Sequence, residues 1–250
     1  MIDPVKISSM RLGGKKLAAV RDQVTAAVKP GVNLKRLDDL ADKLLHETGG
    51  EPAFKKVPGY DWATCINLNA GIVHGIPHAH TIIQDGDIVS IDVGLWYQGY
   101  YTDTSTTVIA GNGSKQQQQF LAAGRAALKT AINLARPHNR IGHISRAIQT
   151  SVEAAGYNCL RNYTGHGVGK ELHEFPSIPC VLNGPIESTP PLEPGMTLAI
   201  EVMYMAGSPE VIKLKDGWTI ATKDNSISGL FEETILVGKK TPHILTASLP

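Results

Sequence analysis

The spacing of apolar residues along the chain predicts four helices. Apolar side chains recur every three or four positions in four stretches, and residues that start or stop helices bound each stretch. Asn33 and Ser114, for example, can each accept a hydrogen bond at the start of a helix. The expected helices cover residues 8–28, 34–47, 115–135 and 141–155.

Short apolar and β-branched runs lie between and after these helices, and they predict strands. The expected strands cover residues 62–67, 72–73, 104–109, 196–205, 210–214 and 229–238, together with a hairpin at 90–104. Helices followed by strands occur twice, and no linker separates the two parts. We therefore expect a single α+β domain over residues 1–250, with two similar halves around a shared sheet.

The predicted hairpin carries two aspartates. If Gln98-Gly99 is a two-residue loop, Asp103 lies opposite Gly94, and Asp92 is its diagonal neighbour on the same face, roughly 7–8 Å away. Two converging carboxylates repel each other unless a proton or a cation lies between them. A slip of one residue would place the aspartates on opposite faces, and they would then be two surface residues near a turn.

Three residues further along the chain favour a cation. His166 lies between glycines, which expose its imidazole, while Glu201 and Glu232 interrupt apolar strands. An acid in an apolar strand is costly to bury unless it is paired or bound to a metal. Together with Asp92 and Asp103 they form a set of oxygen and nitrogen donors that suits Mn²⁺, Fe²⁺, Co²⁺ or Zn²⁺. Two such ions about 3.5–4 Å apart would form a hydrolytic centre.

The composition narrows the class of protein. Apolar residues make up 42% and charged residues 19% of the chain, which is typical of globular proteins. The net charge of +1 argues against a dedicated nucleic-acid or membrane surface, and no apolar run approaches the ~20 residues of a transmembrane helix. The N-terminus lacks the features of a signal peptide. The three cysteines, Cys65, Cys159 and Cys180, are too few and too widely spaced for a disulfide framework. We therefore expect a cytoplasmic protein.

Several short motifs follow one another in a specific order. They are Cys65-Ile66-Asn67, His74-Gly75-Ile76-Pro77, Asp103-Thr104-Ser105, Gly165-His166-Gly167, His173-Glu174 and Phe231-Glu232. In this order they resemble the methionine aminopeptidases of the shorter type I class, over essentially the whole chain. The resemblance implies a pita-bread fold, in which pseudo-twofold halves share a curved antiparallel sheet flanked by helices. It also implies removal of the initiator methionine from nascent proteins.

The resemblance implies a role for each candidate ligand. Asp92 would chelate one ion, Asp103 and Glu232 would bridge two ions, and His166 and Glu201 would complete the other site. Glu201 would also act as the acid and base that handles the proton of the attacking water. The ions would be two divalent metals, with Co, Mn and Fe as the first candidates and Zn and Ni as alternatives.

Further residues are implied to contact the substrate. His173 would donate a hydrogen bond to the developing tetrahedral centre, and His74 would contact the scissile amide or pass a proton to the leaving amine. The methionine side chain would occupy a pocket of Tyr60, Cys65, Leu172 and Trp218, although each of these is also an ordinary core residue type. A small second residue is expected in the substrate. Gly94 is expected to leave room for an ion or for the incoming amine.

Four positions depart from the family's usual pattern: Leu172 replaces an aromatic residue, Val202 a proline, Leu230 a glutamine and Glu233 a histidine. The departures affect the expected pocket shape, rate and preferred metal, and they leave open whether the chain is a housekeeping enzyme or a divergent paralogue. Adjacent strand residues point to opposite faces, so only one of Glu232 and Glu233 can be a ligand. The spacing to Phe231 and Thr234 favours Glu232.

Three alternatives remain at the level of the sequence. The first is a pita-bread peptidase that cuts before proline, although such enzymes usually carry an additional N-terminal domain. The second is a non-catalytic binding paralogue, although all five ligands are present. The third is a nucleotide-binding protein, which only the glycine spacing around His166 favours. The main interpretation has the N-terminal methionine of nascent chains as its partner, with a monomeric protein and transient ribosome association.

Overall fold

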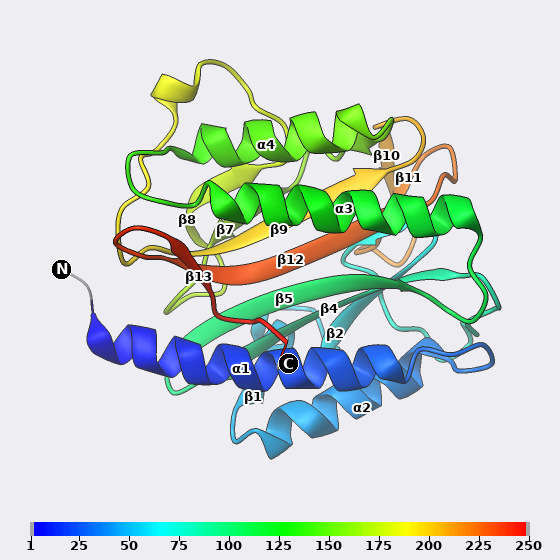
Figure 1. The fold of residues 1–250 in the computed structure, drawn as a ribbon. Helices are drawn as coiled ribbons and strands as arrows, with labels where there is room; N and C mark the ends of the chain where they lie inside the picture. Colours follow the sequence, from blue (N-terminus) through cyan, green and yellow to red (C-terminus); the bar gives the residue numbers. More distant parts are fainter. Residues whose placement is uncertain (1–2, 249–250) are drawn as a thin grey trace.

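The computed structural model describes residues 3–248, and four α-helices in this range pack on one face of a twisted antiparallel sheet (Figure 1). The helices are α1 (Pro4–Ala26), α2 (Leu34–Glu47), α3 (Lys115–Asn133) and α4 (Ile141–Ala154), and the short 3₁₀ turns are η1 (Phe54–Lys56) and η2 (Ile186–Ser188). The four helices predicted from the apolar spacing are therefore confirmed, as is the α+β class.

The helix starts follow from local capping. Asn33 and Ser114 cap α2 and α3 as predicted, and each accepts a hydrogen bond from a backbone N–H of the first turn. Helix α1 begins at Pro4, earlier than the predicted residue 8. The reason is that the Asp3 carboxylate accepts hydrogen bonds from two backbone N–H groups of the first turn, and proline at the first helical position needs no partner.

The main sheet has ten strands within the described residues, in the order β1-β4-β5-β12-β9-β7-β8, with β2 beside β4, β6 beside β9 and β13 beside β12. Their bounds are β1 (Glu51–Pro52), β2 (Thr64–Leu68), β4 (Ile88–Tyr97), β5 (Tyr100–Ile109), β6 (Asn158–Cys159), β7 (Thr164–Gly167), β8 (Glu174–Pro179), β9 (Thr197–Met205), β12 (Ser228–Val237) and β13 (Pro242–Ile244). A small second sheet holds β3 (Gly71–Val73), β10 (Val211–Lys213) and β11 (Ile220–Thr222).

The β4–β5 hairpin has the predicted register. Tyr97 pairs with Tyr100, and the two intervening residues, Gln98 and Gly99, have positive φ angles of 50° and 86°. Positive φ at both positions is the geometry of a type I′ turn, which matches the twist of the strands it joins. Asp103 consequently lies opposite Gly94, and the alternative register, with the aspartates on opposite faces, is wrong.

The two halves of the sheet meet between β5 and β12, a contact that we call the seam. Backbone pairing at the seam covers two residue pairs only. On one side of these pairs, the Thr107 hydroxyl accepts from the Leu230 N–H and donates to the Leu230 carbonyl, at 2.9 and 2.7 Å. On the other side, the Thr234 hydroxyl accepts from the Asp103 N–H and donates to its carbonyl, also at 2.9 and 2.7 Å. Threonine hydroxyls thus continue the ladder where the backbones separate.

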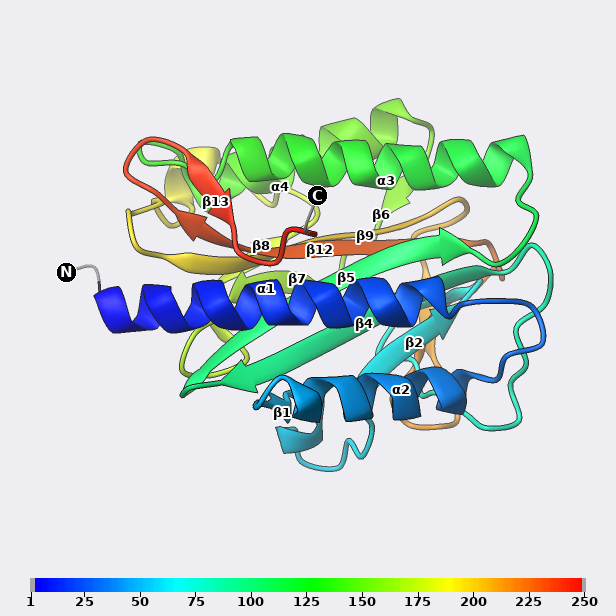
Figure 2. The ribbon, with the colours of Figure 1, turned by 60° about the horizontal axis from the view of Figure 1, so that its bottom comes forward.

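Each half has its own apolar core beneath its pair of helices. Helices α1 and α2 pack with β2 and β4, whereas α3 and α4 pack with β9 and β12. Figure 2 shows α1 lying along the hairpin strands β4 and β5, with α3 above β9 and β12. The helices therefore cover one face of the sheet. No helix among residues 3–248 is long and apolar enough to cross a membrane.

Candidate metal centre

A cavity of about 190 Å³ lies on the sheet face opposite the helices, and it contains the five predicted ligands. Asp92 and Asp103 reach it from the β4–β5 hairpin, His166 from β7, Glu201 from β9 and Glu232 from β12. Their positions depend on the alternation of side chains along each strand, which directs residues of one parity to one face. The fold therefore brings together residues that lie far apart in the sequence.

The donor atoms are close enough to share a cation. One donor atom from each of Asp103, His166 and Glu232 lies within 4.8 Å of the others, and the three side chains are buried. His166 Nε2 is 3.7 Å from Glu201 Oε1. His166 Nδ1 is 2.9 Å from the Gly167 carbonyl oxygen and can donate to it, which leaves the Nε2 lone pair directed toward the carboxylates.

Burial and mutual repulsion strongly shift the pKa values of the side chains in this cluster. Burial raises the pKa of Asp103 to about 7. Burial, followed by the neighbouring carboxylates, raises the pKa values of Asp92, Glu201 and Glu232 well above their usual range. Burial also lowers the pKa of His166 to about 4, so its imidazole is neutral near pH 7 and free to act as a ligand.

Several buried oxygens of the cluster lack a hydrogen-bond partner among the described residues. They are Asp92 Oδ1, Glu232 Oε1 and Ser105 Oγ, and Ser105 pairs in register with both Asp92 and Glu232. Buried carboxylate oxygens without partners are costly unless a cation neutralises them. The residues therefore fit divalent metal ions, which take carboxylate oxygens and imidazole nitrogens as ligands.

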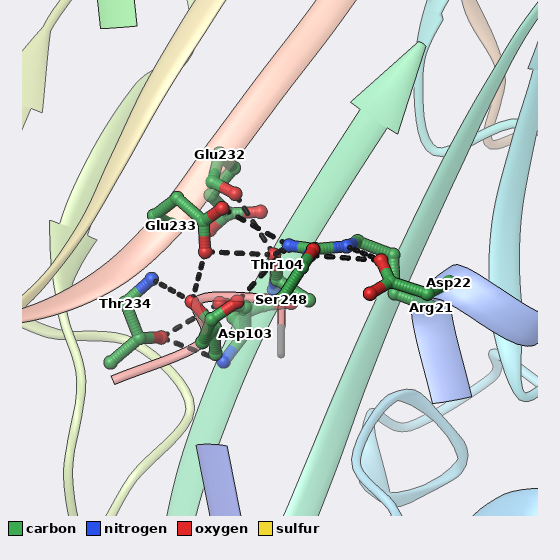
Figure 3. Close-up of polar contacts among 9 residues, drawn as sticks. Arg21, Asp22, Asp103, Thr104, Glu232, Glu233, Thr234 and Ser248 are labelled. Atoms are coloured by element: carbon green, nitrogen blue, oxygen red, sulfur yellow. Dashed lines mark hydrogen bonds and ion pairs between the residues drawn. The ribbon is translucent and has the colours of Figure 1, made fainter. Parts of the chain in front are cut away.

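Glu232 and Glu233 point to different faces of the sheet. Glu232 lines the cavity, whereas Glu233 turns toward α1 and lies 3.1 Å from the guanidinium of Arg21 (Figure 3). This placement agrees with the preference for Glu232 that the spacing to Phe231 indicated. It leaves Glu233 outside the cavity, on the helix-covered side.

Two further histidines line the cavity. The ring of His173 packs edge-on against that of His166, with centroids 4.4 Å apart. His74 packs against Tyr163 and has a φ angle of 59°, a left-handed conformation that costs free energy for a residue other than glycine. Burial, and then the charge of His173, lowers the pKa of His74 to about 4, and burial lowers the pKa of His173. Both rings are therefore neutral near pH 7.

The predicted pocket residues Tyr60, Cys65, Leu172 and Trp218 line the apolar side of the same cavity. Tyr60 packs edge-on against Trp218, with ring centroids 5.1 Å apart. Phe54 and Val57 also line it, and the sequence did not indicate them because the η1 segment has no apolar periodicity.

Gly94 has a packing role that the sequence did not indicate. A Cβ at this position would lie 2.8 Å from Ala53 Cβ and 2.9 Å from Phe54 Cε1. The glycine therefore lets η1 approach the sheet, so that Phe54 can form part of the pocket wall. The expectation that Gly94 also leaves room for an ion or for the incoming amine stays a prediction.

The other departures from the family pattern belong to apolar clusters and are not among the candidate ligands. Val202 and Leu230 belong to the apolar core under α3 and α4. Leu172 belongs to the pocket wall, together with Phe54 and Tyr60. Of the four departures, therefore, Leu172 is the one whose side chain lines the cavity.

Comparison with known proteins places the chain in a family. The sequence profile described as metallopeptidase family M24 matches residues 8–239. The chain belongs to metallopeptidase family M24. Within this family it is 40% identical to methionine aminopeptidase of Aquifex aeolicus over 247 residues, which cover 96% of each chain. It is 39% identical to methionine aminopeptidase 1 of Bacillus subtilis, over 97% of each chain.

Solved structures of the family share the fold. A crystal structure of methionine aminopeptidase from Thermotoga maritima is 39% identical, with a TM-score of 0.95, over 99% of this chain and 100% of that chain. Prolidase from Pyrococcus furiosus is 20% identical, with a TM-score of 0.81, over 100% of this chain and 66% of that chain. The second likeness concerns the fold alone. The pita-bread fold expected from the motifs is therefore confirmed.

Proposed function

We propose that this chain is a metal-dependent aminopeptidase that removes the N-terminal methionine from nascent proteins and peptides. The observation that carries the proposal is a cavity with one apolar side, whose other side holds a cluster of buried carboxylates and one imidazole. A flexible thioether side chain suits a pocket of aromatic, aliphatic and thiol groups. The relatives from Aquifex aeolicus and Bacillus subtilis, which carry the name methionine aminopeptidase, support the same substrate.

The centre would hold two divalent ions. Asp92 would bind one ion, Asp103 and Glu232 would lie between the two, and His166 and Glu201 would bind the other. When bound, such ions polarise a peptide carbonyl and make hydroxide available at neutral pH. Co²⁺, Mn²⁺ and Fe²⁺ are the first candidates, with Zn²⁺ and Ni²⁺ as alternatives, because this donor set accepts several metals.

The side chains around the centre supply proton transfer and orientation. Glu201 would accept the proton of the attacking water and deliver it to the leaving amine, which is the task of a general base and acid. His173 would donate an N–H to the carbonyl oxygen as negative charge develops there. His74 would contact the scissile amide. Both imidazoles can donate without carrying charge, because burial lowers their pKa values.

The pocket would select the substrate by shape. Phe54, Tyr60, Cys65, Leu172 and Trp218 would enclose the methionine side chain on the apolar side of the cavity. A small second residue would be preferred, since a closed site leaves little room beyond the first residue. We further propose that the protein acts in the cytoplasm as a monomer that associates transiently with the ribosome.

A pair of peptide assays tests the substrate. The metal-free protein is reconstituted with Mn²⁺ or Co²⁺, and release of the first residue is measured from Met-Ala-Ser and from Ala-Pro. Methionine release is expected, and it should disappear when a chelator removes the ions. Cleavage of Ala-Pro without methionine release would instead favour the proline-specific alternative, and no release from any peptide would favour a non-catalytic binding protein.

A further inference from the structure

Arg21 on α1 is a charged residue buried on the sheet face opposite the cavity, with 4% of its surface exposed (Figure 3). Burying a guanidinium is costly unless its donors are satisfied. Here every nitrogen donates. Nε and Nη2 both lie 3.0 Å from Asp22 Oδ1, and Nη2 lies 2.7 Å from Ser248 Oγ. Nη1 contacts Thr104, Glu233 and the Thr246 carbonyl.

One route leads from Arg21 to the backbone of Glu232. Arg21 Nη1 donates to Thr104 Oγ1 at 2.7 Å, and Thr104 Oγ1 donates to the Glu232 carbonyl at 2.9 Å. The same threonine belongs to the strand of the first half, β5, while Glu232 belongs to β12. The guanidinium is therefore one hydroxyl away from the main chain of a residue that lines the cavity.

A second route leads to Asp103. Arg21 Nη1 lies 3.1 Å from Glu233 Oε1, and the other oxygen of Glu233 accepts from the Thr246 hydroxyl. That hydroxyl accepts from the Thr234 N–H at 3.0 Å. The Thr234 hydroxyl then bonds both backbone groups of Asp103.

The seam is the part of the sheet where side chains can set the spacing. Backbone pairing covers two residue pairs there, and threonine hydroxyls complete the connection. Asp103 and Glu232 lie on either side of the seam, so the distance between their carboxylates depends on these side chains. The Arg21–Glu233 ion pair connects the two hydrogen-bond routes on the helix-covered face of the sheet. Glu233 occupies a position where the family usually has histidine.

We propose that Arg21 and Glu233 form a positioning pair, which fixes Asp103 and Glu232 relative to each other across the seam and so sets the affinity of the centre for its ions. The inference rests on the proposed metal centre and deepens it. Neither side chain of the pair touches the cavity. Residues outside the ligand sphere that orient the ligands typically change metal affinity 10- to 100-fold when they are replaced.

The test measures Mn²⁺ binding to the metal-free protein by titration calorimetry, at a temperature at which circular dichroism shows every variant folded. Arg21→Met and Glu233→Gln should each weaken binding about 10- to 100-fold. The double variant should bind no more weakly than the weaker single variant, because the two residues act as a unit. Thr104→Val, which removes the hydroxyl between Arg21 and Glu232, should weaken binding too, whereas Thr104→Ser should restore it.

Val24→Ala is the matched control, since Val24 is fully buried in the core on the same helix and takes no part in the network. It should lower the unfolding temperature and leave Mn²⁺ affinity unchanged. Affinities within about twofold of the unmodified chain in Arg21→Met and Glu233→Gln would overturn the proposal, as would an equal loss in Val24→Ala. If Arg21→Met does not fold, equal affinities of the Thr104→Val and Thr104→Ser variants would overturn it.

The outcomes also separate this inference from the proposed function. An unmodified chain that binds no Mn²⁺ would overturn the metal centre and the positioning pair together. A Mn²⁺-loaded chain that releases no methionine, while the variants lose affinity as expected, would overturn the substrate alone and support the positioning pair.

Discussion

Glu232 and Glu233 are neighbours in β12, and their carboxylates lie on opposite faces of the sheet. Glu232 enters a cavity with three other carboxylates, whereas Glu233 pairs with Arg21 at 3.1 Å. A strand places successive side chains on opposite faces, so one short segment serves two environments. Glu232 lies among other carboxylates in the cavity, whereas the buried guanidinium of Arg21 balances the charge of Glu233.

Removing a carboxylate from the cavity should affect the metal-bound and metal-free forms in opposite directions. Asp103→Asn or Glu232→Gln should abolish binding of at least one ion and lower methionine release by about a hundredfold or more. Metal analysis after gel filtration and peptide assays would measure these changes. In the metal-free form the same variants should unfold at a higher temperature than the unmodified chain near pH 8, because an amide at this position needs neither a bound proton nor a buried charge in the folded state. Unchanged metal content would contradict the ligand assignment.

The stability of the metal-free protein should depend on pH. Because burial raises the pKa values of the four cavity carboxylates, that of Asp103 to about 7, the folded state binds more protons than the unfolded state above about pH 4. Burial lowers the pKa values of His74 and His166 to about 4. At these two residues the unfolded state therefore binds more protons than the folded state, up to about pH 6.5. Above that pH the histidines are neutral in both states.

The carboxylates therefore dominate between about pH 6.5 and pH 8, and the free energy of unfolding should fall as the pH rises through this window. A loss of roughly 2 kcal/mol would lower the unfolding temperature by about 5 °C in a chain of this size. Thermal unfolding at both pH values measures the effect, and Mn²⁺ should largely remove it by replacing the protons. A metal-free protein that is more stable at pH 8 would contradict the expectation.

Replacing His74 should separate catalysis from metal binding. His74→Ala should lower turnover about 10²- to 10⁴-fold, with metal content unchanged, because the imidazole would contact the scissile amide and bind no ion. The φ angle of 59° adds a backbone effect to this variant. His74→Asn is the better control, since asparagine tolerates that conformation, and it should show the same loss of turnover. Loss of metal in the asparagine variant would mean that His74 is a ligand.

Gly94→Ala should act on the substrate pocket. The added methyl group would meet Ala53 Cβ at 2.8 Å and Phe54 Cε1 at 2.9 Å, so η1 must shift and carry Phe54 with it. Overpacking of this kind costs about 1–3 kcal/mol of stability. We expect a higher KM for Met-Ala-Ser and unchanged Mn²⁺ affinity, measured by steady-state kinetics and calorimetry. Weaker Mn²⁺ binding with an unchanged KM would instead favour the expectation that Gly94 leaves room for an ion.

Features set by short-range interactions could be predicted from the sequence. The caps at Asn33 and Ser114 and the loop at Gln98-Gly99 each depend on a few adjacent residues. The hairpin register followed from that loop, and the alternation of side chains then placed Asp92 and Asp103 on one face. The order of the motifs extended the prediction to ligands in distant strands.

Features set by contacts between distant segments could not be predicted in this way. Phe54, in the turn η1, enters the pocket because Gly94 on β4 leaves room for it. Arg21 is a charged residue in an otherwise apolar helix face, and its partner Glu233 lies 212 positions further along the chain. Neither contact has a local signal, because each depends on how the sheet brings two segments together.

The division of the ligands between the two halves also determines when the centre can assemble. The hairpin supplies Asp92 and Asp103 early in synthesis, but His166, Glu201 and Glu232 follow only after α3 and α4 have been made. During translation the two aspartates are therefore synthesised well before the other three ligands. The ligand set is complete only once β12 has been made, so we expect the chain to acquire its metal late in maturation.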